Sequence, residues 1–177
     1  MKKDGKLLNL VLRYSLMIVF VMLSVKIFYV IFTPLTIYPV FFVLKQFFNS
    51  YMMGNFIFVN SFPIEIIGPC VAGSAYLLLL ILNLSTPNIN LSKRLTITLF
   101  SFALLLLVNI IRIVALSFMF VSGNSFFDMA HLLFWYAGSV LFVVGIWFLS
   151  VKLFKVKEIP FYSDIKFLFD GSKLKKN

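Results

Sequence analysis

Three residues in this chain have side chains suited to covalent chemistry. Cys70 is the single cysteine, His131 the single histidine, and Arg112 an arginine inside a long apolar run. A cysteine attacks as its thiolate, which a nearby cation favours. A histidine can accept the thiol proton and later protonate a leaving amine. An arginine held in a low-dielectric site can stabilise the thiolate or an acyl oxyanion. Together these residue types fit acyl transfer by a thiol nucleophile.

Each of the three also has an ordinary structural interpretation. A lone cysteine in an apolar chain is commonly a small buried hydrophobic residue. A lone histidine at a helix start is commonly an interfacial hydrogen-bonding residue. An arginine at membrane depth is costly, so it is expected to be functional or paired with a lipid headgroup. A catalytic site is expected only if the fold brings the three residues to one place.

The composition predicts a polytopic membrane protein. Of the 177 residues 62% are hydrophobic, and the mean hydropathy is +1.03. Ordinary soluble domains are about half apolar and about a quarter charged. The formal net charge is +10, but the basic residues stand at the ends of apolar runs, so nucleic acid is not an expected partner. One cysteine and one histidine are too few for a disulfide framework or a metal centre, and no phosphate-binding or dinucleotide motif suggests a cofactor.

The apolar runs predict an all-α bundle of about four transmembrane helices in a single domain. The expected spans are about 7–32, 70–84, 95–121 and 131–154, followed by a basic cytoplasmic tail over 155–177. A core of about 30 Å needs about 20 apolar residues per helix.

The segment between the first two expected spans has a different character. Pro34 to Phe48 contains two prolines and Lys45, and it is short for a full span. An interfacial or re-entrant helix on the outer face is therefore expected. Phe56–Val59 and Ile64–Ile67, separated by Asn60–Ser61, resemble two short strands of a small outer-face hairpin.

The distribution of basic residues predicts the sidedness of the bundle. With four spans, the head, the loop over 85–94 and the tail are cytoplasmic, and both termini lie inside. These segments and the span ends next to them contain thirteen of the sixteen Lys and Arg residues, namely Lys2, Lys3, Lys6, Arg13, Lys93, Arg94, Lys152, Lys155, Lys157, Lys166, Lys173, Lys175 and Lys176. Basic residues favour the cytoplasmic side. A fifth span over 34–48 would place Lys93 and Arg94 outside, so four spans are expected.

This topology places the three reactive residues near the outer face. Arg112 lies seventeen residues beyond Leu95, which is roughly 25 Å at about 1.5 Å per residue. It is therefore expected just below the outer interface, where Cys70 and His131 begin their spans. Asn109, three residues earlier, lies on the same helical face and could hold the guanidinium or a substrate carbonyl.

These residues carry a resemblance to a known family. With Cys70–Gly73 (CVAG) opening one span, Asn109–Ile113 (NIIRI) deep in the next and His131 heading the last, the region from Ile64 to Phe154 resembles the exosortase/archaeosortase family of membrane cysteine transpeptidases. The resemblance implies that Cys70 is the nucleophile, Arg112 the stabilising cation and His131 the acid/base. Asn109 and Gly73 are supporting residues.

The chain departs from this family in two respects. Many members have a serine or threonine after the cysteine, where this chain has Val71 followed by Ala72. Many members also have more spans, so substrate recognition by extra helices is not expected here.

The resemblance also implies partners and a location. The expected substrates are secreted proteins with a C-terminal tail made of a short motif, a hydrophobic helix and a basic cluster. The tail is cleaved and the new carboxyl end passes to an acceptor, whose identity as an amine or a lipid stays open. The expected location is a prokaryotic cell membrane, in contact with membrane lipid and with the site facing outside.

Two other functions remain open at this stage. An intramembrane hydrolase would use the same thiol and let water resolve the acyl-enzyme. A non-catalytic membrane assembly or chaperone-like bundle would pair Arg112 with a lipid phosphate or with an acid on its partner.

Overall fold

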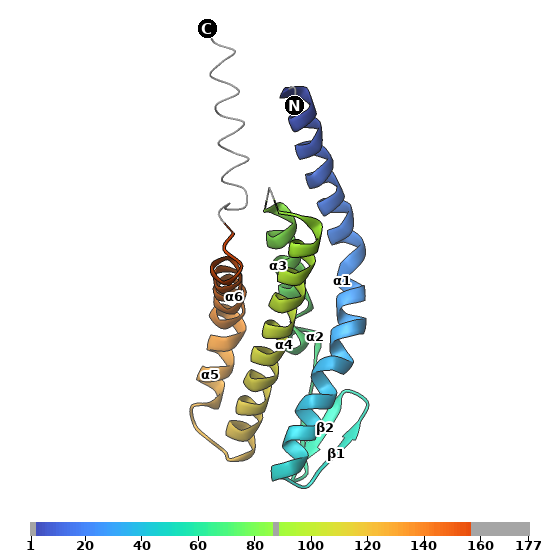
Figure 1. Ribbon diagram of the computed structural model, residues 1–177. Coiled ribbons are helices and arrows are strands. Elements are labelled where there is room, and N and C mark those ends of the chain that lie inside the picture. Colours follow the sequence, from blue (N-terminus) through green and yellow to red (C-terminus); the bar gives the residue numbers. More distant parts are fainter. Residues whose placement is uncertain (1–2, 87–88, 157–177) are drawn as a thin grey trace.

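The computed structural model describes residues 3–86 and 89–156, which form a helical bundle with a small sheet (Figure 1). Residues 1–2 of the predicted basic head and residues 157–177 of the predicted tail lie outside the described residues. The elements in chain order are α1 (Lys3–Phe47), β1 (Ser50–Met53), β2 (Phe56–Val59), β3 (Phe62–Glu65), α2 (Gly68–Val71), α3 (Gly73–Ser85), α4 (Leu91–Val121), α5 (Phe127–Leu133), η1 (Phe134–Gly138) and α6 (Ser139–Leu153).

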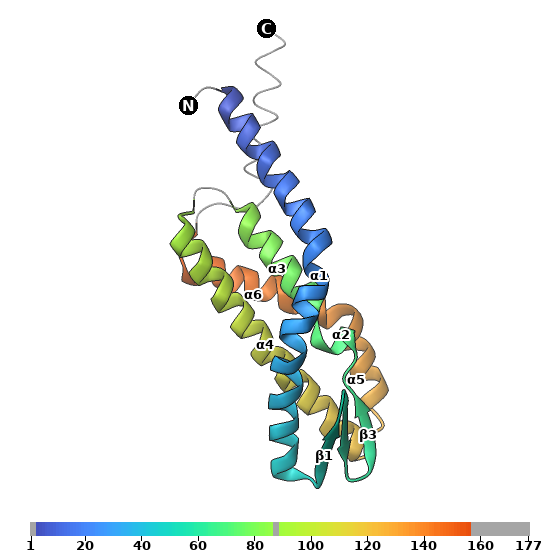
Figure 2. The ribbon, with the colours of Figure 1, turned by 90° about the vertical axis from the view of Figure 1, so that its right-hand side faces the viewer.

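Helices α3 and α4 form the centre of the bundle, because both pack against α1 on one side and α6 on the other. The first turn of α1, the end of α3 and the start of α4 lie toward one end of the molecule (Figures 1 and 2). The sheet and the connection from α4 to α5 lie at the opposite end. The basic pair Lys93–Arg94 and the start of α1 therefore share one end, opposite the sheet.

Among the described residues, two helical segments are long and apolar enough to cross a membrane, Val25–Phe47 of α1 and all of α4. A third candidate is the α5–η1 segment together with α6, which bend by 50° relative to each other. Helix α3 has 13 residues, about 20 Å at about 1.5 Å per residue. The structure thus has two candidate spans, or three with the bent pair, where the sequence predicted about four.

The segment predicted as a separate interfacial or re-entrant helix, Pro34–Phe48, is instead the continuation of α1, with both prolines inside the helix. An internal proline removes a backbone hydrogen bond and costs about 3 kcal/mol. Tertiary packing offsets this cost, because one stripe of α1 stays buried through both prolines. Its members, at four-residue intervals, are Phe28, Phe32, Thr36, Val40 and Leu44.

The predicted hairpin is confirmed, and it belongs to a three-stranded antiparallel sheet. Strands β2 and β3 pair from Phe56↔Glu65 to Val59↔Phe62. Asn60 and Ser61 connect them with φ of 47° and 73°, the left-handed conformation that two-residue hairpin turns favour. Strand β3 begins two residues earlier than predicted, and β1, which pairs with β2, was not predicted.

One face of α4 is buried along most of its length. The buried residues recur every four positions, as Ile97, Ser101, Leu105, Asn109, Ile113 and Ser117. Ser101 and Ser117 donate to the carbonyl four residues earlier in α4, each over 2.8 Å. Ser101 also shares a hydrogen bond of 2.9 Å with Ser150 of α6. This polar and apolar stripe fixes α4 against its neighbours.

The predicted cytoplasmic loop over 85–94 is shorter than expected, because α4 already begins at Leu91. Residues 87–88 of this loop lie outside the described residues. Arg94 donates to the carbonyls of Leu84 and Thr86, each over 2.8 Å, and to that of Asn83. The last carbonyls of a helix have no donor within that helix. Arg94 caps those at the end of α3, and so it links α3 to α4 besides contributing positive charge.

Candidate active site

Cys70 lies on the single turn α2, separated from α3 by a sharp break. The break is at Ala72, whose φ of 60° is left-handed, a conformation that is uncommon outside glycine. Cys70 N–H donates to the Ile67 carbonyl over 2.9 Å, and Ala72 N–H to that of Gly68 over 3.2 Å. The helix predicted to begin at Cys70 therefore begins three residues later, at Gly73, and the cysteine stands on its own turn before it.

The supporting residue Gly73 allows α1 to approach this break closely. A Cβ at Gly73 would lie 2.8 Å from Cε1 of Tyr29, and one at Gly68 would lie 3.4 Å from the same atom. A distance under 3 Å is shorter than van der Waals contact allows. The Tyr29 ring thus packs behind Cys70 only because residue 73 has no side chain.

Two side chains of α4 bind the backbone of Cys70. Asn109, which is 3% exposed, donates from Nδ2 to the Cys70 carbonyl over 2.7 Å and to the Val71 carbonyl over 3.5 Å. Arg112 donates from Nη2 to the same Cys70 carbonyl over 3.4 Å. The predicted partners of Asn109 were the guanidinium or a substrate carbonyl, but the structure gives it the carbonyl of the cysteine itself.

The guanidinium of Arg112 is only partly satisfied. Its Nε is buried and has no hydrogen-bond partner, and no ion pair involves it within the described ranges 3–86 and 89–156. A buried cation without a counter-charge is costly, so this group is suited to receive an anion or a developing negative charge.

His131 lies in the middle of α5 and does not open the helix as predicted. Its ring stacks on Phe127 with centroids 5.6 Å apart and meets Trp135 edge-on at 5.9 Å. Among the residues that the structure describes, the imidazole makes no hydrogen bond, and neither Glu65 nor Asp128 pairs with it. The contacts with Phe127 and Trp135 thus hold the ring on the side of the α5–η1 segment.

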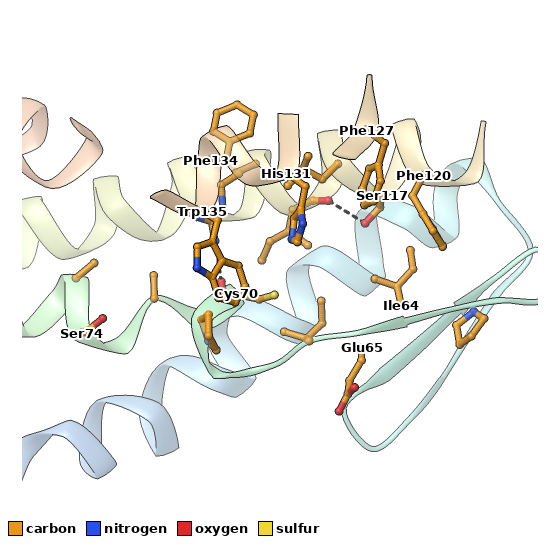
Figure 3. Close-up of a pocket in the computed structure, with 18 of the residues that line it drawn as sticks. Ile64, Glu65, Cys70, Ser74, Ser117, Phe120, Phe127, His131, Phe134 and Trp135 are labelled. Carbon is orange, nitrogen blue, oxygen red and sulfur yellow. Dashed lines mark hydrogen bonds between the residues drawn. The ribbon is translucent and has the colours of Figure 1, made fainter. Parts of the chain in front are cut away.

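One cavity of about 460 Å³ brings the three reactive residues together. Cys70 lines it from α2, Arg112 from α4 and His131 from α5. Figure 3 shows His131 and Trp135 projecting toward the side of Cys70, and Glu65 projecting away from both. Asn109 and Gly73 are not among the lining residues and support the site from behind Cys70. Tyr29, Ser117 and Trp135 also line it; no chemical pattern in the sequence singled them out.

Burial dominates the electrostatics of the thiol, which lies outside the helices long enough to span a membrane. Burial raises the pKa of Cys70 above its ordinary value, whereas a backbone hydrogen bond at Ile67 and the charge of Arg112 oppose that rise. The charge of Glu65 adds to the rise. The resting cysteine is therefore a protonated thiol at neutral pH, and it needs a proton acceptor in order to attack.

Comparisons of the chain with protein-family models, with curated proteins and with solved structures find no match. Among the described residues, no group of three or more His, Cys, Asp or Glu could hold a metal ion. The chemistry must therefore be inferred from the cavity itself. A thiol, an imidazole and a partly satisfied guanidinium around one space can together carry out acyl transfer.

Proposed function

We propose that the protein is a membrane-embedded cysteine transpeptidase. The observation that carries the proposal is that Cys70, Arg112 and His131, from three different helices, line the same cavity. The cavity is also lined by the carboxylate of Glu65, but that side chain projects away from Cys70 (Figure 3). The resemblance to the exosortase/archaeosortase family supports the same assignment.

The reaction follows from the three side chains. His131 accepts the Cys70 proton as Sγ attacks the scissile carbonyl carbon, and the resulting oxyanion is stabilised by Arg112. The C–N bond then breaks, and the imidazolium of His131 donates its proton to the leaving amine, which leaves a thioester on Cys70. An acceptor amine attacks the thioester with His131 again taking a proton, and the thiolate leaves and is reprotonated.

The resting arrangement requires one adjustment before the first step. In the part of the chain that the structure describes, His131 makes no hydrogen bond to the Cys70 thiol. Catalytic hydrogen bonds are often long before substrate binds and tighten in the complex. Substrate in the cavity would bring the imidazole of α5 toward Cys70 of α2.

The proposed substrates are secreted proteins that end in a short motif, a hydrophobic helix and a basic cluster. Exposed apolar side chains on α4, among them Leu107 and Ile111, are 54% and 58% exposed and offer a surface for that helix. In the proposed topology, α1, α3, α4 and α5–α6 each cross the cell membrane of a prokaryote. Both termini are cytoplasmic and the cavity opens outside.

C-terminal proteomics in the native host tests this function. Secreted proteins with such tails should be shortened in wild-type cells and full-length when the chromosomal copy carries Cys70→Ala. Met129→Ala, an exposed position on α5, serves as a control at matched membrane abundance. Shortening that continues with Cys70→Ala would contradict the proposal and favour a non-catalytic bundle. A free carboxylate at every new end would indicate hydrolysis instead of transfer.

A further inference from the structure

The break at Ala72 leaves the backbone carbonyl of Cys70 without a helical donor. In a continuous helix this oxygen would accept from the amide four residues later, Ser74 N–H. Ala72 is left-handed, and the donors recorded for the Cys70 oxygen are instead the side chains of Asn109 and Arg112. The turn that carries Cys70 is therefore held by hydrogen bonds from side chains of α4 and not by a backbone amide of α3.

Asn109 differs from the other polar members of the buried stripe on α4. Ser101 and Ser117 donate to carbonyls of their own helix, and Ser101 also shares a hydrogen bond with the Ser150 hydroxyl. Asn109 instead donates to the backbone of another helix. A buried polar side chain is costly unless it is hydrogen-bonded. Asn109 is 3% exposed, and its hydrogen bond to the turn that carries Cys70 satisfies the buried amide.

The same carbonyl links Asn109 to Arg112. Asn109 makes the shorter bond, 2.7 Å against 3.4 Å for Arg112. The oxygen is therefore satisfied mainly by the amide, and the guanidinium keeps an unpartnered Nε in the part of the chain that the structure describes. Without the amide, Arg112 would be the only side-chain donor to this oxygen and would be drawn toward the backbone.

We infer that Asn109 is a positioning residue, which fixes the Cys70 turn through its carbonyl and keeps the Arg112 guanidinium available to the thiolate and to the reacting carbonyl. This inference rests on the proposed function for its catalytic meaning. The contact itself can be tested without a substrate, because Cys70 is the only thiol in the chain.

The test uses Asn109→Ser in the purified full chain. Serine already occupies two positions of this stripe, so the variant should fold, but its side chain is too short to reach α2. The rate of Cys70 alkylation by iodoacetamide is followed against pH for the wild type, Asn109→Ser, Arg112→Gln and the double variant. Ser101→Ala is the matched control, since it removes a buried α4 hydrogen bond remote from Cys70.

Asn109→Ser should move the alkylation midpoint to higher pH and slow the reaction about tenfold at neutral pH, which corresponds to one pH unit. The double variant should be no slower than Arg112→Gln alone, because two residues acting through one contact are not additive. Asn109→Gln, which keeps the amide donor, should restore most of the wild-type profile. Ser101→Ala should leave the profile unchanged.

A wild-type profile for Asn109→Ser would overturn the inference. So would full additivity with Arg112→Gln, or an equal effect of Ser101→Ala, since either would indicate a general loss of packing. If Asn109→Ser does not fold, the Asn109→Gln profile decides: a profile as slow as that of Arg112→Gln contradicts the inference. Failure of tail processing in cells would count against the transpeptidase and not against this contact, because alkylation needs no substrate.

Discussion

Arg112 contacts Cys70 through the backbone: its Nη2 donates to the Cys70 carbonyl oxygen over 3.4 Å, while its Nε has no hydrogen-bond partner in the described part of the chain. The guanidinium is thus anchored beside the nucleophile and still has a donor free. An anchored cation with a free donor suits a group whose task is to receive a developing negative charge.

The first prediction concerns this charge. Arg112→Gln should reduce tail processing by about 10²–10³-fold, the loss typical of removing one oxyanion donor, with little change in thermal stability. Arg112→Lys should recover only part of the activity, because an ammonium lacks the planar fork of the guanidinium. Processing is measured by C-terminal proteomics at equal membrane abundance. Full activity of Arg112→Gln would show that the charge has no catalytic role.

The second prediction separates His131 from Arg112. His131→Gln should abolish processing, because His131 is the proposed base and the Glu65 carboxylate, which also lines the cavity, projects away from Cys70 (Figure 3). Alkylation of Cys70 should stay nearly unchanged, since the resting imidazole makes no hydrogen bond to the thiol. Iodoacetamide kinetics and C-terminal proteomics on the same variant test both parts. Processing at the wild-type level would remove His131 from the mechanism.

The third prediction uses pH. Burial raises the pKa of the Cys70 thiol and the Glu65 charge raises it further, whereas Arg112 opposes the rise. Alkylation should therefore accelerate as pH rises through and above neutrality. Glu65→Gln should shift the midpoint to lower pH and Arg112→Gln to higher pH. Asp128→Asn, which removes a carboxylate from α5, is the control and should cause no shift. Equal shifts for Glu65→Gln and Asp128→Asn would mean that the net charge of the protein, and not the position of each carboxylate, determines the pKa of the thiol.

The fourth prediction concerns packing behind the nucleophile. Gly73→Ala would place a Cβ 2.8 Å from the Tyr29 ring, and overpacking of this kind costs about 1–3 kcal/mol. The melting temperature should fall, and Tyr29→Leu should relieve the loss in the double variant. Gly145→Ala is the control, because its Cβ would meet nothing within 4 Å and alanine favours a helix by about 1 kcal/mol. A stable Gly73→Ala would mean that Tyr29 is not held against this turn.

Local patterns in the sequence were sufficient to predict the hairpin and the long apolar helices. The Asn60–Ser61 turn between apolar runs is a short-range feature, and the structure has it. The continuity of α1 was not predictable in this way, because two prolines argue locally for a break. Only packing of residues such as Phe32 and Val40 against α3 and α4 keeps the helix intact.

The site was accessible to sequence reasoning through its rare residue types. One cysteine, one histidine and one arginine inside a long apolar run stand out in an apolar chain, and all three line one cavity. The contact of Asn109 with the Cys70 carbonyl was not predictable, because it depends on a left-handed break at Ala72, where no glycine marks it. The position of His131 within α5 likewise depends on where that helix begins, at Phe127.

The most direct measurement is whether Cys70 carries an acyl group during turnover. Cells of the native host expressing the tagged full chain are quenched in acid, and peptides of the chain are mapped by mass spectrometry with and without neutral hydroxylamine. A hydroxylamine-labile adduct on Cys70, bearing the new C-terminal residue of the shortened secreted proteins, is the result that the proposed mechanism predicts. Unmodified Cys70 in cells that shorten their tails, together with equal shortening in a Cys70→Ala strain, would contradict it.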